Sequence, residues 1–166
     1  MGNSKMTISI FGMGYVGSVT AACLIKQGHK VIGVDIVNSK IDKLNQGKWP
    51  IYEPGLNDLN SPELIKENFF ATTNEKLALS KSEVSLICVG TPSSSNGEIE
   101  FKYLKNVFNS IIKYFEKKPK EHSILIRSTI PPGTTHELIS YVHKDIDKKL
   151  KIGFLPEFLR EGSSIS

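Results

Sequence analysis

Met6-Thr-Ile-Ser-Ile-Phe-Gly-Met-Gly-Tyr-Val-Gly17 is the stretch of sequence that decides the fold. Its first half, Met6–Phe11, is short and mostly apolar, so it predicts a β-strand. The run 18–27 is rich in Ala, Leu and Val and predicts a helix. Between the two, glycines are spaced as G-x-G-x-x-G: Gly12, Gly14 and Gly17. A glycine turn that joins a strand directly to a helix is typical of a phosphate-binding βα unit.

Each glycine of this turn has a separate physical role. Gly12 permits the tight turn, Gly14 lets the backbone approach a pyrophosphate, and Gly17 allows helix and strand to pack closely. The free N–H groups and the positive end of the helix then favour phosphate oxygens. The alternative is a glycine-rich turn that only packs.

Asp35 ends the second predicted strand, Lys30–Asp35, about 20 residues beyond the glycines, where a ribose-binding acid belongs. A carboxylate there accepts hydrogen bonds from ribose hydroxyls and repels a 2′-phosphate, so it favours NAD over NADP. Lys40 is a candidate for contact with the ribose or a phosphate. A solvated lysine on a helix is nearly as good an interpretation of Lys40, and the alternative for Asp35 is a surface residue.

Apolar strands and helices alternate along the rest of the chain. Further strands are expected at 69–72, 84–90, 123–127 and 151–155, and helices at 39–46, 75–79, 101–115, from Thr134 to about Lys144, and from Pro156 to Glu161. Residues 48–62 contain three prolines and are expected to be mostly loop. This order predicts an α/β fold, a Rossmann-type doubly wound and mostly parallel sheet with helices on both faces. It forms one domain, 6–166, after a disordered lead or tag remnant at 1–5.

Three loops follow predicted strands and should meet at the carboxyl edge of the sheet, where such folds bind ligands. They are 90–93, 128–131 and 156–157. The cofactor contacts expected from the first two loops and the residue before them are Val89, Gly90, Thr91, Pro92, Ser128 and Thr129.

Charge and hydropathy exclude several classes of function. The chain has 166 residues, a net charge of +4 and a pI near 9.0, but arginine occurs only at positions 127 and 160 and the lysines are scattered among acids. Readers of nucleic acid cluster their charge on one face, so no nucleic-acid partner is expected. No apolar run is long enough to cross a bilayer, and there is no signal peptide. A cytoplasmic protein without a membrane partner is expected.

The two cysteines, Cys23 and Cys88, sit in apolar stretches with no paired Cys or His spacing. They are interpreted as small buried hydrophobic residues in a reducing compartment. No metal site is expected.

Six motifs in this order closely resemble the UDP-glucose/GDP-mannose dehydrogenase family, and they cover nearly all of the chain from Met6 onward. They are FGMGYVG (11–17), VD (34–35), PIYEPGL (50–56), VGTPS (89–93), RST (127–129) and PEFLREG (156–162). The resemblance implies oxidation of the C6 alcohol of a nucleotide sugar to a carboxylate with two NAD in succession. An aldehyde, a cysteine-bound thiohemiacetal and a thioester are the implied intermediates.

The resemblance also implies roles for individual residues. Cofactor binding carries over to Gly12, Gly14, Tyr15, Val16, Gly17, Asp35, Lys40, Thr91 and Thr129. Glu157 is implied as the acid/base of the hydrolytic step and Glu161 as a neighbour of substrate and nicotinamide, and Thr129 joins them as a catalytic candidate. The implied substrate-binding segment is Glu157, Phe158, Leu159, Arg160 and Glu161.

The expected helix at 156–161 would place Glu157 and Glu161 at positions i and i+4 on one face. A pair of nearby carboxylates suits general acid–base work. The alternative is that Glu157 only stabilises a helix N-terminus.

The sequence departs from the family in three ways. The nucleophilic cysteine, which neither Cys23 nor Cys88 matches, is absent together with the central helix and the C-terminal domain. Leu155 stands where the family has asparagine before the Pro-Glu motif. We therefore expect an N-terminal domain alone, which binds NAD without turnover and is possibly monomeric, whereas the complete enzyme forms a homodimer.

Three hypotheses remain open on the sequence. The first is the NAD-binding domain of a dehydrogenase for UDP-glucose or GDP-mannose, with the sugar undecided. The second is a non-catalytic NAD-binding module, and the third is a related NAD-dependent hydroxyacid dehydrogenase.

Overall fold

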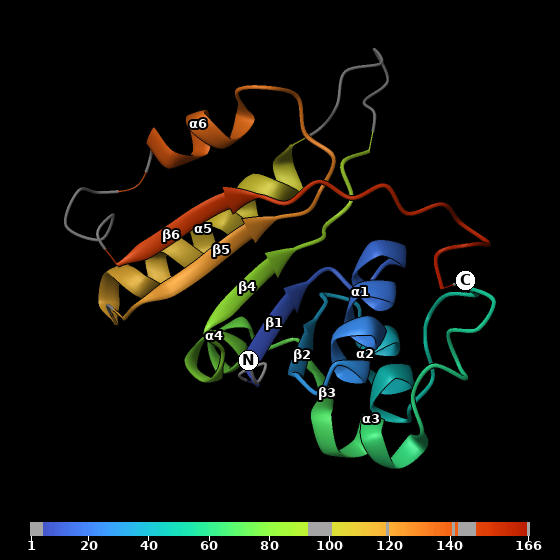
Figure 1. Cartoon of the computed structure of the whole chain (residues 1–166). Coiled ribbons are helices and arrows are strands. Elements are labelled where there is room, and N and C mark those ends of the chain that lie inside the picture. Colours follow the sequence, from blue (N-terminus) through green and yellow to red (C-terminus); the bar gives the residue numbers. More distant parts are fainter. Residues whose placement is uncertain (1–4, 93–100, 119, 141, 143–148, 166) are drawn as a thin grey trace.

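Six parallel strands form one sheet in the order β3-β2-β1-β4-β5-β6 (Figure 1). The computed structural model describes residues 5–92, 101–118, 120–140, 142 and 149–165. The strands are β1 (Thr7–Phe11), β2 (Lys30–Val34), β3 (Phe69–Thr72), β4 (Val84–Ile87), β5 (His122–Ile126) and β6 (Leu150–Phe154). The strand order reverses between β1 and β4, which is the position where doubly wound sheets bind ligands. The predicted Rossmann-type fold is confirmed.

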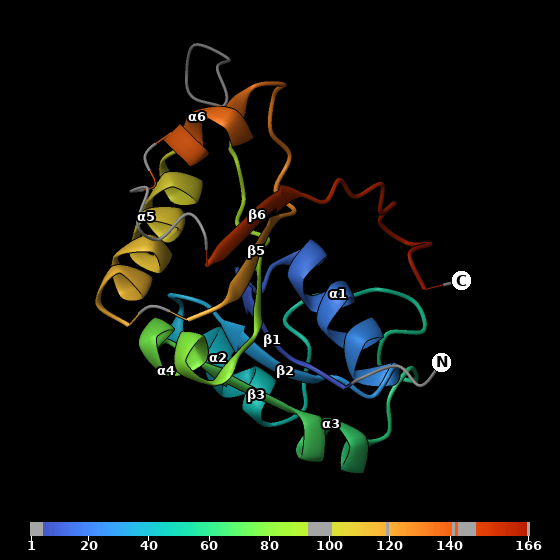
Figure 2. The same ribbon diagram turned by 60° about the vertical axis from the view of Figure 1, so that its left-hand side comes forward.

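Helices cover both faces of this sheet. One layer consists of α1 (Tyr15–Lys26), α2 (Asn38–Asn45) and α3 (Pro62–Asn68), and the other of α4 (Glu75–Lys81), α5 (Lys102–Lys117) and α6 (Thr134–Ser140). Figure 2 shows α1 and α3 on one side of the strands and α5 and α6 on the other. The parallel strands read as apolar runs because both of their faces are covered.

Two buried clusters hold the layers together. Under α1, Ile10 and Ile25 are fully buried with Met13. On the opposite face, Phe108 and Phe115 of α5 are fully buried in a second cluster. The first cluster places α1 directly over β1, and this fixes the glycine turn between them.

Two helices differ from the sequence prediction: α1 starts earlier than expected, and α3 was not predicted. α1 begins at Tyr15, three residues earlier than expected, because Gly14 serves as its N-cap. α3 lies mostly beyond the expected loop 48–62 and was not predicted, although its start carries a recognisable signal. The N–H of Leu64 donates to Oγ of Ser61 at 3.2 Å, and Pro62 is the first helical residue.

The expected helix at 156–161 does not form. Residues 155–160 are irregular, and a turn follows at Glu161 and Gly162. The carboxylate of Glu157 takes the N–H of Leu159 at 2.8 Å, and the side chain of Leu159 packs against Val19 and Leu56. These contacts outweigh the local helical pattern, so Glu157 and Glu161 do not share a helix face.

Two other expected features fall at least partly on residues that the structure does not describe. Residue 93, the last of the predicted loop 90–93, and the expected helix end near Lys144 lie outside the described residues. α6 has Thr134 as its first residue, and the carboxylate of Glu137 accepts a hydrogen bond from Lys105 at 2.9 Å.

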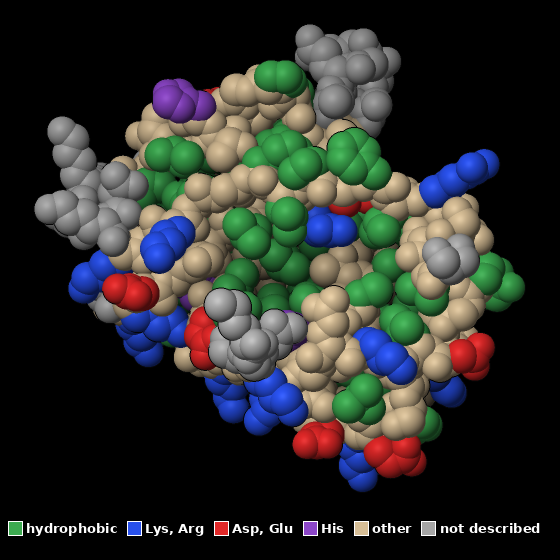
Figure 3. Space-filling model, viewed as in Figure 1, with side chains coloured by type: hydrophobic (Ala, Val, Ile, Leu, Met, Phe, Trp, Pro, Cys, Tyr) green, Lys and Arg blue, Asp and Glu red, His purple; other side chains and the backbone are tan. Residues whose placement is uncertain are grey.

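The surface seen in Figure 3 is mixed in charge. Apolar side chains gather across the middle of this face, and basic side chains are interspersed with acidic ones along its lower edge. Among the described residues, no helix is both long enough and apolar enough to span a bilayer.

Candidate functional site

The chain turns sharply where β1 ends. Gly12 has a φ of +94°, and a Cβ atom there would lie 2.8 Å from the carbonyl oxygen of Cys88. The N–H of Gly12 donates to the carbonyl oxygen of Val34 at 2.8 Å. A side chain is therefore excluded both by conformation and by the close approach of the backbone that follows β4.

The other two glycines of the turn have opposite surroundings. A Cβ atom on Gly17 would lie 2.0 Å from the carbonyl oxygen of Gly12, so this glycine allows the helix to sit against the turn. A Cβ atom on Gly14 would have no protein atom within 4 Å, so Gly14 borders open space. The first turn of α1 carries no acidic residue. Its N–H groups and dipole therefore favour an anion at this end.

Asp35 connects the end of β2 to the glycine turn. One carboxylate oxygen accepts the N–H of Met13 at 3.0 Å and the ammonium of Lys40 at 3.3 Å, and the other accepts the N–H of Val37 at 3.0 Å. The side chain is almost fully buried. A carboxylate has about four acceptor positions, so capacity remains for a ribose hydroxyl. Its charge disfavours a phosphate at the same place.

A cleft of about 720 Å³ brings the cofactor candidates together at the carboxyl edge of the sheet. The predicted residues that line it are Gly12, Gly14, Asp35, Lys40, Val89, Gly90 and Pro92. Sequence reasoning did not single out Ile36, which is 82% exposed, or Tyr103, which is 48% exposed, and both line the cleft. Exposed apolar side chains beside Asp35 suit a flat ring. Their positions, directly after Asp35 and at the start of α5, were the signal that the sequence offered.

Hydrogen bonds join the loop after β4 to the loop after β5, beside this cleft. The buried hydroxyl of Ser128 donates to the carbonyl oxygen of Val89 at 2.7 Å. The hydroxyl of Thr91 donates to the carbonyl oxygen of Thr129 at 3.2 Å. Thr91, Ser128 and Thr129 do not line the cleft, and Thr129 is exposed at its edge of the sheet.

The segment after β6 presents the predicted substrate residues. The N–H of Leu155 extends the ladder to the carbonyl oxygen of Ile126 at 2.9 Å. Beyond it, Phe158 is 93% exposed and Glu161 is exposed, whereas Glu157 is half-buried in its own turn. The segment therefore leaves the same edge of the sheet as the cleft.

Tyr15, Val16 and Gly17 do not line the cleft, although they follow Gly14 directly in the first turn of α1. The side chain of Tyr15 points away from the cleft, because its hydroxyl donates to Glu53 at 2.7 Å. Burial raises the pKa of Tyr15, and the nearby charge of Glu53 acts in the same direction. The backbone N–H of Tyr15 is thus the group that remains for a ligand.

Neither cysteine has the properties of a nucleophile. Burial raises the pKa of the Cys88 thiol to about 12, against a lowering effect of Arg127. Burial also raises the pKa of Cys23, which is half-buried on α1. Among the described residues, no group of His, Cys, Asp and Glu side chains has the arrangement of a metal site.

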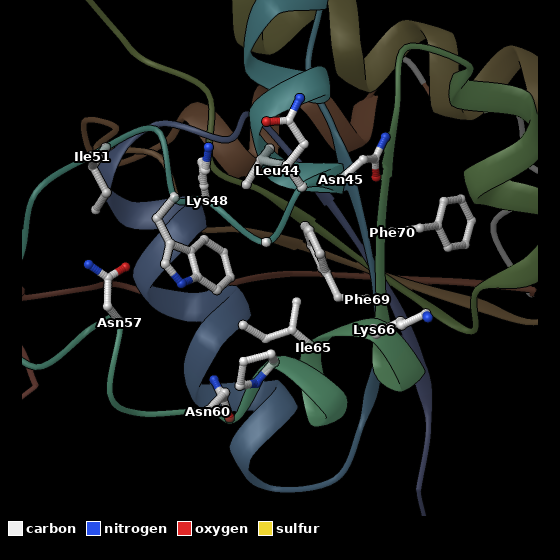
Figure 4. A pocket seen from close by; sticks show the side chains of 14 residues that line it. Leu44, Asn45, Lys48, Ile51, Asn57, Asn60, Ile65, Lys66, Phe69 and Phe70 are labelled. Carbon is white, nitrogen blue, oxygen red and sulfur yellow. The ribbon is translucent and has the colours of Figure 1, made fainter.

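A second cavity of about 820 Å³ lies between α2, α3 and the loop before α3 (Figure 4). Leu44, Ile65 and Phe69 face one another across it, and Asn57 and Asn60 lie at its other side. None of the predicted site residues lines this cavity, and neither Asp35 nor the turn of Gly12, Gly14 and Gly17 borders it. Its larger volume does not make it the cofactor site.

Comparison with known proteins agrees with this geometry. Residues 6–166 match the family model of the UDP-glucose/GDP-mannose dehydrogenase family, NAD binding domain. The chain is 44% identical over 165 residues to the GDP-mannose 6-dehydrogenase of Pseudomonas aeruginosa, and this covers 96% of the chain and 38% of that protein. It is 36% identical to the UDP-glucose 6-dehydrogenase of Bacillus subtilis, covering 95% of the chain and 34% of that protein.

The crystal structure of a ternary complex of GDP-mannose dehydrogenase from Pseudomonas aeruginosa superposes with a TM-score of 0.87 at 43% identity, covering 95% of this chain and 37% of that chain. The chain thus spans well under half the length of the relatives that it matches. A 3-hydroxyisobutyrate dehydrogenase of Mycobacterium tuberculosis is only 14% identical and shares the fold alone. The glycine turn, the placement of Asp35 and these matches lead to one conclusion: the chain belongs to the UDP-glucose/GDP-mannose dehydrogenase family and corresponds to its NAD-binding domain.

Proposed function

We propose that the chain holds NAD in the cleft between the glycine turn and the loop after β4, as the cofactor-binding part of a nucleotide-sugar 6-dehydrogenase. The observation that carries the proposal is that Gly12, Gly14 and Asp35 line one cleft. The open side of Gly14 fits a pyrophosphate, and the buried carboxylate of Asp35 fits a ribose. The residues present therefore fit the dinucleotide.

The binding roles follow from the groups that each residue offers. The N–H groups of Tyr15, Val16 and Gly17 would hold the pyrophosphate, and Asp35 with Lys40 would hold the adenine ribose. The loops 89–92 and 128–129 would border the other half of the cofactor. When bound, NAD supplies the acceptor for a hydride from the alcohol carbon.

The catalytic roles of Glu157, Glu161 and Thr129 are part of this proposal. One oxygen of Glu157 accepts the N–H of Leu159, which leaves the other free to hold or move a proton. Glu161 and Thr129 are exposed at the same edge of the sheet and would contact substrate. The covalent step needs an accessible thiolate, which Cys23 and Cys88 do not provide, so this chain by itself would bind without turnover.

The substrate of the complete enzyme would be a nucleotide sugar, held in part by the segment 157–161. GDP-mannose is the first candidate, because the 44% identical relative is a GDP-mannose 6-dehydrogenase and the UDP-glucose 6-dehydrogenase is 36% identical. The proposal also includes a homodimeric complete enzyme in the cytoplasm.

Isothermal titration of the chain with NAD and with NADP tests the cofactor assignment. We expect heat of binding with NAD and clearly weaker binding of NADP. No heat with NAD at millimolar concentration contradicts the proposal. In the complete dehydrogenase, reduction of NAD with GDP-mannose and with UDP-glucose decides the sugar.

A further inference from the structure

Three segments that are far apart in sequence meet at the side chain of Glu53. This residue lies in the loop before α3, yet its side chain is only 3% exposed. Around it are Tyr15, the first residue of α1, and the turn 160–164 that follows the predicted substrate segment. Neither the glycine turn nor the Pro-Glu motif indicates that these parts touch.

Three short hydrogen bonds converge on the Glu53 carboxylate. One oxygen accepts from the Tyr15 hydroxyl and from the N–H of Gly162, both at 2.7 Å. The other oxygen accepts from the N–H of Ser164 at 2.7 Å. Burial acts to raise the pKa of Glu53, but these hydrogen bonds outweigh it and hold the pKa below its usual value. The ionised form is therefore the one that the surroundings bind.

The turn on the other side of this contact is closed by its own hydrogen bonds. The Ser164 hydroxyl lies 2.8 Å from the Tyr15 hydroxyl and donates to the carbonyl oxygen of Arg160 at 2.8 Å. Gly162 has a φ of +88°, which points its N–H toward the carboxylate without the strain that a side chain would bring.

Apolar contacts bind the same segment at both ends. Leu159 and Ile165 pack in a cluster with Val19 of α1 and with Leu56. A Cβ atom on Gly55 would lie 3.1 Å from the side chain of Ile165. The segment 159–165 is thus fastened to α1, whereas Phe158 and Glu161 remain exposed.

We propose that Glu53 is a positioning residue of the dehydrogenase: it fixes the substrate segment 157–161 relative to the N-terminus of α1, where the cofactor pyrophosphate would bind. This inference rests on the proposed function. Glu53 is not among the residues that line the cofactor cleft, so it acts only through Tyr15, Gly162 and Ser164. Its loss would alter the distance between the two sites and leave the cleft intact.

The variant Glu53→Gln tests the contact with little change in shape. An amide has one acceptor oxygen, so at least one of the two backbone N–H groups would face an NH₂ group and lose its partner. We expect amide hydrogen exchange at Gly162 and Ser164 to accelerate by about tenfold or more, as for the loss of a charge-assisted hydrogen bond. NAD affinity of the chain should stay within about twofold. The matched control is Glu67→Gln, since Glu67 is exposed on α3.

A purely structural role is separated from a positioning role by kinetics of the complete dehydrogenase. With Glu53→Gln we expect kcat/KM for the nucleotide sugar to fall by about tenfold or more at an unchanged KM for NAD. Glu53→Asp, which keeps the charge, should recover part of the lost kcat/KM for the nucleotide sugar. An equal fall in kcat/KM for NAD and for the nucleotide sugar would overturn the proposal.

Three further outcomes decide the remaining cases. Unchanged exchange at Gly162 and Ser164 in Glu53→Gln would refute the contact itself. If this variant does not fold, Glu53→Asp takes its place, because its shorter side chain withdraws the carboxylate from both N–H groups, and unchanged exchange at Gly162 and Ser164 would then count against the proposal. If the unmodified chain binds no NAD, the proposed function fails, and the exchange measurement still reports on the Glu53 contact separately.

Discussion

A Cβ atom on Gly17 would lie 2.0 Å from the carbonyl oxygen of Gly12, whereas a Cβ atom on Gly14 would have no protein atom within 4 Å. The two glycines therefore serve different purposes in one motif. Gly17 is required by the packing of α1 against the turn. No described protein atom stands where a side chain at Gly14 would lie, so this side of the turn is open to a ligand.

This difference gives a paired prediction. Gly17→Ala should lower the free energy of unfolding by about 3 kcal/mol or more, because the clash is with backbone that cannot rotate away. Gly14→Ala should change it by less than about 0.5 kcal/mol but weaken NAD binding by about tenfold or more. Urea unfolding and isothermal titration of both variants provide the measurements. A Gly14→Ala variant that binds NAD as the unmodified chain does would show that the phosphate does not lie there.

The glycine turn shows how much the sequence alone could predict. The strand–turn–helix unit, the doubly wound fold and the acid at the end of the second strand follow from patterns that are local in sequence, and the structure confirms the turn geometry and the fold. The cofactor residues all stay predictions, and some of them, such as Thr129, do not line the cleft.

Asp35→Asn is expected to change both stability and cofactor preference. Asp35 is almost fully buried and accepts two backbone N–H groups, from Met13 and Val37, so an amide there would leave one N–H group without an acceptor, at a cost of about 1–3 kcal/mol. NAD affinity should fall by about tenfold, while the preference for NAD over NADP shrinks because the repulsion of a 2′-phosphate is removed. Titration with both cofactors measures the ratio.

Asp42→Asn is the matched control, because Asp42 is exposed on α2. It should leave the NAD to NADP ratio unchanged. An unchanged ratio in Asp35→Asn as well would place the ribose elsewhere.

The region that sequence reasoning got wrong is the segment after β6. The spacing of Glu157 and Glu161 suits a helix, but Leu159 is drawn into the cluster under Leu56, and Gly162 and Ser164 donate to Glu53. These partners lie more than a hundred residues away in sequence, so no local pattern could reveal them.

The cysteines should be inert in the folded chain. Cys88 is almost fully buried with a pKa raised to about 12, and Cys23 is half-buried with a raised pKa. Since the thiolate is the reactive form, a disulfide reagent at pH 8 should modify Cys23 slowly and Cys88 only after unfolding in denaturant. Mass spectrometry of the labelled chain assigns the sites. Rapid native labelling of Cys88 would contradict the buried position and reopen a catalytic role for it.

His122 makes the stability of the fold depend on pH. The ring is buried against Phe115, its Nε2 lies 2.8 Å from the Ser85 hydroxyl, and within the described part of the chain its Nδ1 has no hydrogen-bond partner. Burial, and secondarily the charge of Lys120, lower its pKa from 6.5 to about 4. The unfolded chain therefore binds a proton more readily than the folded chain does between these two values.

The free energy of unfolding therefore falls as the pH falls through this range. Stability from the neutral ring is complete above the unfolded pKa of 6.5 and is lost as the pH falls toward about 4. The loss amounts to roughly 2–3 kcal/mol by pH 4 for a shift of this size. Urea unfolding between pH 7.5 and 4 should show a decline that is shallower in His122→Gln, which cannot be protonated there, and unchanged in the control His136→Gln, since His136 is exposed on α6. Equal slopes in the unmodified chain and in His122→Gln would mean that the buried ring is not what drives acid destabilisation.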